Sequence, residues 1–180
     1  LLLKIIVDFK KPSGLAINIA KSEVLLLNMQ LSHDNGLKTT NSAKITGIHY
    51  CVDQEKMLYD NWTEVLRQVK AKISSWNCRH LSIIGRATIL KAQIKSIVLY
   101  RLNVMSMPDK VLDELNSIIF PFAWGANKNL EPVARVVQKM ENGGLGVPCF
   151  SALAFAAKCN IINRLRNGGS HNGWMNIARK

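Results

Sequence analysis

Eight basic side chains lie between Val65 and Pro108, in a stretch that contains no Asp or Glu. A nucleic-acid backbone is a regular line of negative charge, and each phosphate that a cation neutralises releases condensed counterions. The stretch therefore predicts nucleic-acid binding without base preference, with Arg86 as the strongest candidate for a contact. The alternative is that the long Lys and Arg side chains only solvate the outside of a helical bundle. For Arg86, the alternative is that it pairs with a helix terminus. The eight residues are Arg67, Lys70, Lys72, Arg79, Arg86, Lys91, Lys95 and Arg101.

The excess of positive charge belongs to the whole chain. Its 180 residues include 24 Lys and Arg against 12 Asp and Glu, a net charge of +12, with +5 up to residue 90 and +7 beyond it. Such a field favours a polyanionic partner. The composition is 48% apolar and 20% charged, which excludes a disordered tail, a collagen-like chain and a disulfide scaffold. The longest apolar runs are shorter than the ~20 residues that cross a bilayer, so we expect no membrane crossing.

Residue types that could do catalysis are present but scattered. A two-metal site for nucleotidyl transfer needs carboxylates close together on a strand and its turn, and the sequence shows no such cluster. The pairs Asp53/Glu55 and Asp113/Glu114 are better explained as helix-start charges. No His has a Ser or Cys partner suggested by spacing, so no hydrolase triad is predicted. The four cysteines lack zinc-site spacing and are interpreted as reduced core thiols: Cys51, Cys78, Cys149 and Cys159.

The first part of the chain predicts a short helix and a β-hairpin. Residues 1–11 have helical apolar spacing and stop before Pro12, which a helix cannot easily cross. The apolar run 22–30 and the alternating run 44–52 predict two paired strands, joined by a loose loop with an Asn35–Gly36 turn.

From Gln54 onward the pattern is helical. Apolar residues at steps of three and four predict a helix of about five turns that ends near Trp76. A second helix starts with Ser82 as its N-cap, carries Lys91 and Lys95 one turn apart, and is closed by Pro108. Its expected apolar face consists of Ile83, Ala87, Leu90, Ile94, Ile97 and Val98. Helices over 109–120 and 151–166 follow, with an aromatic turn at 121–129 and a glycine hinge at 142–146.

The predicted fold class is therefore α+β, mainly α, with a β-hairpin followed by a helical bundle. We expect three parts: residues 1–53 with the hairpin, 54–140 as the helical part, and 141–180 as a hinge with a small helical extension. Trp62, Trp76 and Trp124 are better explained as buried bundle aromatics than as stacking platforms for bases.

Several ordered motifs resemble one enzyme family. SGLAIN at 13–18 and KSE at 21–23 resemble the stretch after the catalytic strand in reverse transcriptases of LINE-type (non-LTR) retrotransposons, and ITGI at 45–48 is similar to their LG[IV] hairpin. Trp76, Arg79, Leu81-Ser82 and Gly85-Arg86 resemble the W..R.LS..GR signature that opens the thumb. The family's next landmarks, Y......P, F.W and GGLG, are similar to Tyr100 with Pro108, Phe122-x-Trp124 and residues 143–146. Thr46 departs from the pattern, because the family usually has Leu there.

The resemblance implies the C-terminal palm and thumb region of an RNA-directed DNA polymerase. It places Lys21 at the edge of the nucleotide site, Gly47 at the turn that supports the primer end, and Arg79 and Arg86 at the start of the thumb. Together with the basic stretch, the predicted nucleic-acid contacts are Lys70, Lys72, Arg79, Arg86, Lys91 and Lys95.

The same resemblance implies the partners and the missing parts. The expected partners are an RNA template, an RNA/DNA or DNA duplex, and an upstream polymerase half. The aspartate-bearing motifs that bind Mg²⁺ in the parent polymerase are not in this sequence, so we expect no cofactor and assign no catalytic residue in this fragment. The implied localisation is intracellular, in the cytoplasm and nucleus.

Three other interpretations stay open. The chain could be a stand-alone helical nucleic-acid-binding module, or an inactive translated retroelement remnant. It could also be a peripheral membrane or protein-interaction module that uses the basic amphipathic helix from Ser82 to Met105.

Overall fold

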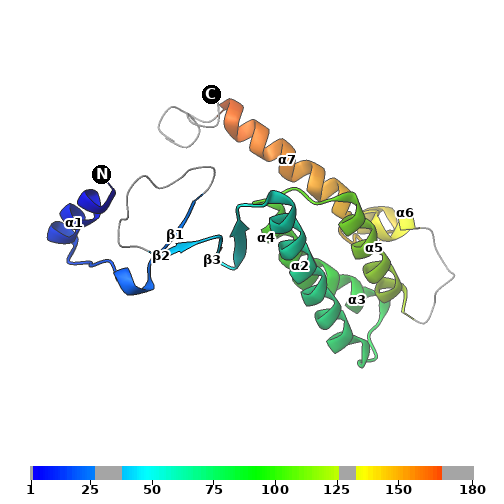
Figure 1. The fold of residues 1–180 in the computed structure, drawn as a ribbon. Coiled ribbons are helices and arrows are strands. Elements are labelled where there is room, and N and C mark those ends of the chain that lie inside the picture. The colour runs from blue at the N-terminus through cyan, green and yellow to red at the C-terminus, as the bar shows by residue number, and fades with distance from the viewer. Residues whose placement is uncertain (1, 27–37, 126–132, 168–180) are drawn as a thin grey trace. The chain divides into compact units, whose positions relative to one another are not determined.

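The computed structural model describes residues 2–26, 38–125 and 133–167. The chain forms two compact units, Leu1–Asp60 and Asn61–Lys180. Helices dominate, and the described strands form two small two-stranded sheets (Figure 1). This confirms the predicted class, α+β and mainly α. The boundary between the two units falls within helix α2 (Gln54–Asn77), and the predicted division into three parts stays a prediction.

Helix α1 (Leu2–Ser13) opens the first unit and includes Pro12. The predicted end before Pro12 is therefore wrong. Proline has no backbone N–H, but in the last turn of a helix this removes only one hydrogen bond, so the helix can include it. The helix ends where Gly14 adopts a φ of +68° and its N–H bonds to the carbonyl of Lys10 at 3.0 Å. Glycine is common at this position because the left-handed conformation costs it little. The 3-10 turn η1 (Ile19–Lys21) follows, with Asn18 as its N-cap.

The strands do not pair as predicted. Strand β1 (Glu23–Leu25) pairs in parallel with β2 (Lys38–Thr40), and β3 (Ser42–Ile45) pairs antiparallel with β4 (Ile48–Cys51). The run 44–52 is therefore two strands rather than one, because a turn divides it. The predicted Asn35–Gly36 turn lies outside the described residues.

The turn between β3 and β4 has two residues, and both have positive φ: +49° at Thr46 and +84° at Gly47. This is the pattern of a type I′ turn, whose twist matches that of the paired strands. Glycine adopts the conformation freely, whereas a β-branched residue is strained there. Gly47 thus lies in a hairpin turn, and its role at a primer end stays a prediction.

Helix α2 has a capped start and one buried face. Oδ1 of Asp53 accepts hydrogen bonds from the N–H groups of Glu55 at 2.9 Å and Lys56 at 3.2 Å. This confirms Asp53 as a helix-start charge, since a carboxylate satisfies N–H groups that have no partner within the helix. The predicted apolar stripe is also confirmed by five buried residues on this helix: Trp62, Val65, Leu66, Val69 and Ile73.

The second predicted helix contains a π turn. Its N-cap is Ser82, as predicted, because Oγ accepts a hydrogen bond from the N–H of Gly85 at 3.1 Å. Helix α3 (Ile83–Ile89), the π turn η2 (Leu90–Ile94) and helix α4 (Lys95–Leu102) run on without a break. In the π turn, the N–H of Lys95 bonds to the carbonyl of Leu90, five residues back.

The π turn changes which residues are buried. The predicted face is wrong at two positions: Ile83 is exposed and Ile97 is only half-buried. The physical reason is that a π turn holds one more residue than an α turn, so residues before and after it are out of phase with a 3.6-residue repeat. Pro108 does not close this helix, which ends at Leu102. The buried apolar residues are Ala87, Ile89, Leu90, Ile94, Val98 and Leu102.

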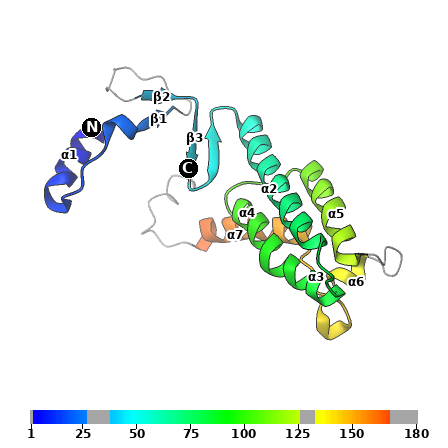
Figure 2. The same cartoon turned by 90° about the horizontal axis from the view of Figure 1, so that it is seen from below.

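Helix α5 (Asp109–Trp124) begins directly after Pro108 and includes Pro121. The predicted end at Phe120 is therefore wrong, for the same reason as at Pro12. The helix ends at Gly125, whose φ is +63° and whose N–H bonds to the carbonyl of Pro121 at 3.0 Å. Helix α3 packs against α5, and helix α7 (Phe150–Asn167) contacts both α4 and α5 (Figure 2). Helix α7 confirms the helix predicted over 151–166.

The glycine segment between helix α6 (Val133–Val137) and α7 is a hydrogen-bonded turn that includes the 3-10 turn η3 (Met140–Asn142). The N–H of Gly144 bonds to the carbonyl of Lys139 at 3.0 Å, and the N–H of Gly146 bonds to the carbonyl of Gln138 at 2.8 Å. A Cβ on Gly144 would lie 2.0 Å from the same carbonyl oxygen of Gln138. The glycine at this position therefore permits a close backbone approach, and the role of the segment as a hinge stays a prediction.

Candidate nucleic-acid interface

The eight basic residues of the 65–108 stretch have different surroundings. Two of them bind carboxylates: Nε of Arg67 lies 2.7 Å from Glu64, and Nζ of Lys70 lies 2.7 Å from Glu114. The expected row of cations without counterions is therefore wrong at these two positions, because Glu64 precedes the stretch and Glu114 belongs to α5. The hydrogen bonds that the Arg67 guanidinium donates to the Glu64 carboxylate raise the pKa of Arg67. The Lys70 side chain stays 56% exposed, and pairs of this kind contribute only ~0–1 kcal/mol.

Arg86 contacts backbone carbonyls. Its Nη1 donates a hydrogen bond to the carbonyl of Phe122 at 3.1 Å, and its Nε donates one to the carbonyl of Leu81 at 3.3 Å. The guanidinium carbon also lies 5.3 Å from the centre of the Phe122 ring. A cation at the last carbonyls of α5 satisfies an unpaired acceptor and opposes the negative end of the helix dipole. The alternative interpretation of Arg86, as a partner of a helix terminus, is thus confirmed, and its contact with nucleic acid stays a prediction.

Lys72 and Arg79 are exposed cations on and just beyond the C-terminal half of α2. Neither forms an ion pair within the described ranges. The guanidinium of Arg79 lies over the ring of Trp76, 4.5 Å from its centre. Nε1 of Trp76 in turn donates a hydrogen bond to Oε1 of Gln93 in η2 at 3.1 Å. The cation is therefore held near a tryptophan that ties two helices together, while its charge stays accessible.

Lys91 and Lys95 line a single cavity of about 530 Å³. Both side chains are half-buried, and neither binds a carboxylate in the part of the chain that the structure describes. Nζ of Lys91 lies 3.6 Å from the sulfur of Met140. The prediction that these lysines stand together is confirmed. Arg101, by contrast, is only 6% exposed, and its guanidinium carbon lies 5.3 Å from the ring centre of Tyr100.

The other two predicted site residues belong to the first unit. Lys21 is exposed at the end of η1, and its backbone N–H bonds to Oδ1 of Asn18 at 3.2 Å. Gly47 lies in the β3–β4 turn. The predicted site residues therefore divide between the two units: Lys21 and Gly47 belong to the first unit, and the six predicted nucleic-acid contacts belong to the second. Their roles toward nucleic acid stay predictions.

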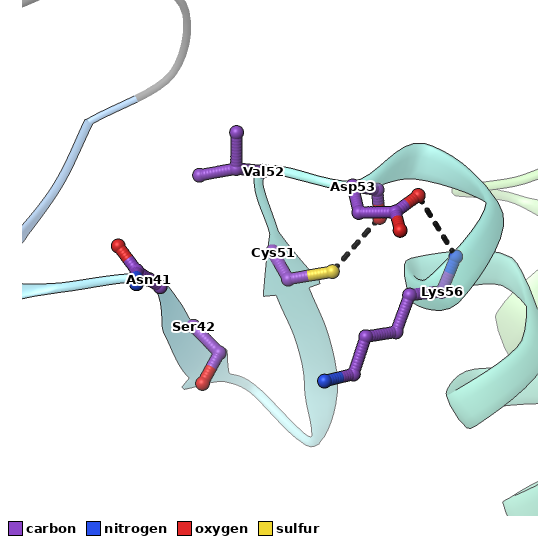
Figure 3. Close-up of a pocket in the computed structure, with 6 residues that line it drawn as sticks. All are labelled: Asn41, Ser42, Cys51, Val52, Asp53 and Lys56. Carbon is purple, nitrogen blue, oxygen red and sulfur yellow. Dashed lines mark hydrogen bonds between the residues drawn. The ribbon is translucent and has the colours of Figure 1, made fainter.

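A second cavity, of about 360 Å³, lies in the first unit beside the start of α2 (Figure 3). Sγ of Cys51 donates a hydrogen bond to the carbonyl of Asp53 at 2.8 Å, and the carboxylate of Asp53 caps the helix. That carboxylate is therefore already engaged. Among the described residues, no three His, Cys, Asp or Glu side chains come together as a metal site would require. None of the described helices combines the length and apolar character needed to cross a membrane.

The cysteines are free thiols, but they are not core residues. Cys78 is exposed, and Cys51, Cys149 and Cys159 are half-buried, so the core placement was wrong. Cys149 is a feature that the sequence interpretation missed. It directly precedes α7, where hydrogen bonds from the Ser151 side chain and from the backbone of Ala152 lower the pKa of its thiol. A Cys two residues before a Ser at the start of a predicted helix was the available signal.

The three tryptophans predicted to be buried in the bundle rather than to stack on bases differ in their burial. Trp62 is 1% exposed, and its Nε1 donates a hydrogen bond to the carbonyl of Ser106 at 2.9 Å. This confirms the expected packing role for Trp62, since a buried indole needs a partner for its N–H group. Trp76 and Trp124 are half-buried.

Comparison with known proteins gives one distant similarity. No family model matches the chain. Over 99 aligned residues, the chain is 28% identical to a protein of Arabidopsis thaliana whose name describes it provisionally as a ribonuclease H protein. The alignment covers 52% of this chain and 16% of the relative, so the chain spans about a sixth of that protein's length.

Proposed function

We propose that this chain is a nucleic-acid-binding part of a retroelement-type enzyme and that it holds a duplex without reading its bases. The net charge of +12 supports a polyanionic partner. The similarity to a protein named as a ribonuclease H supports an enzyme that acts on nucleic acid. Phosphate contacts of this kind position a protein on a duplex but carry no sequence information.

One observation carries this proposal. Four of the predicted contact residues have no carboxylate partner among the residues that the structure describes. Three lie on helical segments and Arg79 stacks on Trp76 just beyond α2, which a hydrogen bond from Trp76 to Gln93 joins to the π turn. Cations on connected helices keep their spacing, so binding a line of phosphates costs less ordering entropy than it would on a loop. These four residues are Lys72, Arg79, Lys91 and Lys95.

The finer proposal is that the parent enzyme is a reverse transcriptase of a LINE-type retrotransposon. In this proposal, the second unit acts as the thumb on the template–primer duplex, and the turn at Gly47 supports the primer end. The W..R.LS..GR motif supports it, because Trp76 and Arg79 stack and Ser82 caps the helix that carries Arg86. The Mg²⁺ of such an enzyme would bind outside this fragment, since the described residues do not fit a metal ion. The parent enzyme would be localised in the cytoplasm and nucleus.

Fluorescence anisotropy with a labelled RNA/DNA hybrid tests the binding proposal. If each of the four cations contacts one phosphate, log K should fall with log salt at a slope of about −3.6. The double variant Lys72→Gln with Arg79→Gln should reduce the steepness by about 1.8. The matched control is Lys110→Gln with Lys158→Gln, which removes two exposed lysines elsewhere on the second unit.

Three results would overturn the proposal. Binding that does not change with salt would exclude phosphate contacts, and equal effects of the two double variants would indicate diffuse charge instead. Capture of the chain by phosphatidylserine vesicles in the presence of excess hybrid would favour the peripheral membrane alternative.

A further inference from the structure

The cavity at Lys91 and Lys95 joins parts of the second unit that are distant in the sequence: the π turn region and the segment that runs from the glycine turn into α7. The π turn and the start of α4 contribute the two lysines. The glycine turn contributes Gly146 and Val147, and the first two turns of α7 contribute a face of small and apolar residues. That face consists of Ala152, Leu153 and Ala156, next to Cys149. The cavity therefore depends on the fold of the second unit.

We propose that this cavity binds a terminal phosphate monoester, carried by the end of a nucleic-acid strand or by a free nucleotide. The proposal rests on the proposed function, because it assigns one part of a nucleic-acid surface a separate task. It goes beyond a general grip on a duplex, since it distinguishes a strand end from the continuous backbone.

The charges around the cavity favour an anion. Two half-buried lysines line it, and no carboxylate of the described residues does. Cys149, Ala152 and Leu153 bring the N-terminal end of an 18-residue helix to the same wall, where the helix dipole amounts to roughly half a positive charge. Hydrogen bonds at this helix start also lower the pKa of the Cys149 thiol, so the wall already favours a negative group.

The charge and size of the cavity favour a monoester over the internal backbone. A monoester carries about −1.5 to −2 charges at neutral pH, which matches two lysines, whereas an internal phosphodiester carries one. The volume of about 530 Å³ is in the range of small-ligand sites. The apolar walls at Val137, Val147 and Pro148 leave room for the terminal sugar.

Two backbone features place the lysines. Lys91 lies in the π turn and Lys95, whose N–H bonds to Leu90, directly follows it; π turns are frequent at functional sites. A Cβ on Gly146 would lie 3.2 Å from Nζ of Lys91. The absence of a side chain there leaves space for the ammonium group inside the cavity.

The test compares 5′-phosphorylated, 3′-phosphorylated and unphosphorylated forms of one oligonucleotide. We expect at least one phosphorylated form to bind about tenfold more tightly, as one additional charge-assisted contact would give. Lys91→Gln with Lys95→Gln should abolish this preference, and Lys91→Arg with Lys95→Arg should keep it. The pair Lys72→Gln with Arg79→Gln should weaken all forms equally and keep the preference.

A second readout uses the thiol in the cavity wall. Alkylation of Cys149 by iodoacetate, followed by peptide mass spectrometry, should slow about tenfold in the presence of the ligand, while exposed Cys78 serves as the internal control. Protection by adenosine monophosphate equal to that by the oligonucleotide would identify free nucleotides as the source, and stronger protection by the oligonucleotide would identify strand ends.

The outcomes separate the two proposals. Absence of both protection and phosphate preference, together with intact salt-dependent hybrid binding, would overturn this inference alone. A preference that survives Lys91→Gln with Lys95→Gln would overturn it as well. Loss of all salt-dependent binding in the wild-type chain would overturn the proposed function instead.

Discussion

Arg86 of α3 holds the C-terminal turn of α5 by donating a hydrogen bond from Nη1 to the carbonyl oxygen of Phe122, at 3.1 Å. A Cβ on Gly125 would lie 2.9 Å from the guanidinium carbon, so the glycine directly after α5 keeps this space open. Two sequence landmarks, Gly85-Arg86 and Phe122-x-Trp124, are therefore joined in space. The residue that the charge pattern singled out for nucleic acid first serves the packing of the bundle.

Arg86→Lys should lower the free energy of unfolding by about 1.5–3 kcal/mol, because an ammonium group cannot donate in the same fork to two carbonyls. Urea denaturation followed by the helical circular dichroism signal would measure the change. The control Arg79→Lys should change stability by less than about 0.5 kcal/mol, since Arg79 is exposed. If Arg86→Lys left stability intact but removed hybrid binding, the capping role would be wrong.

Thr46→Asn should stabilise the β3–β4 hairpin, because Asn adopts a positive φ more readily than a β-branched residue does. We expect a gain of about 0.5–1 kcal/mol in local stability, a part of the 1–3 kcal/mol cost of such strain. Amide hydrogen exchange at Ile48 would show it as slower exchange. Thr46→Val keeps the branched Cβ and is the matched control. Equal exchange rates in both variants would contradict strain at this turn.

Gly144→Ala should disrupt the turn before α7, because its Cβ would meet the carbonyl oxygen of Gln138 at 2.0 Å and the backbone would have to move. The neighbouring Gly143→Asn should be tolerated, since nothing lies within 4 Å of that Cβ and Asn accepts a positive φ. Thermal unfolding and limited proteolysis between Lys139 and Pro148 would compare the two. A stable, protease-resistant Gly144→Ala variant would exclude the close approach.

The thiol of Cys149 should react at lower pH than the same cysteine in the denatured chain, because Ser151 and the start of α7 lower its pKa. A lowered pKa in the folded state contributes stability that is present above the unfolded pKa and is lost as pH falls through the folded pKa. Site-resolved iodoacetamide labelling against pH measures the midpoint. Ser151→Ala should raise it, whereas Ser117→Ala in α5 should not. An unchanged midpoint in Ser151→Ala would contradict the assigned cause.

The features that could be predicted from sequence are those that depend on neighbouring residues. The buried stripe of α2, the cap at Asp53 and the cap at Ser82 follow from spacing and side-chain chemistry within one or two turns. The pairing of Glu23–Leu25 with Lys38–Thr40 could not be predicted, because strand register depends on distant segments.

The candidate site shows the same division. The spacing of Lys91 and Lys95 on one helix border was available from the sequence. The cavity around them was not, since Val147 and Cys149 reach it only through the folded glycine turn. Glu114 could not be foreseen as the partner of Lys70 either, because the two residues meet only when α2 and α5 are packed in the bundle.

The π turn at Leu90–Ile94 gives the second unit a property that an uninterrupted α-helix lacks. One residue can be deleted there and the backbone can close as an ordinary α-helix with the downstream half in nearly the same orientation, because the π turn holds one residue more than an α turn. A deletion elsewhere in a helix rotates every downstream side chain by about 100°, whereas a deletion at this position would keep Val98 and Leu102 in the core.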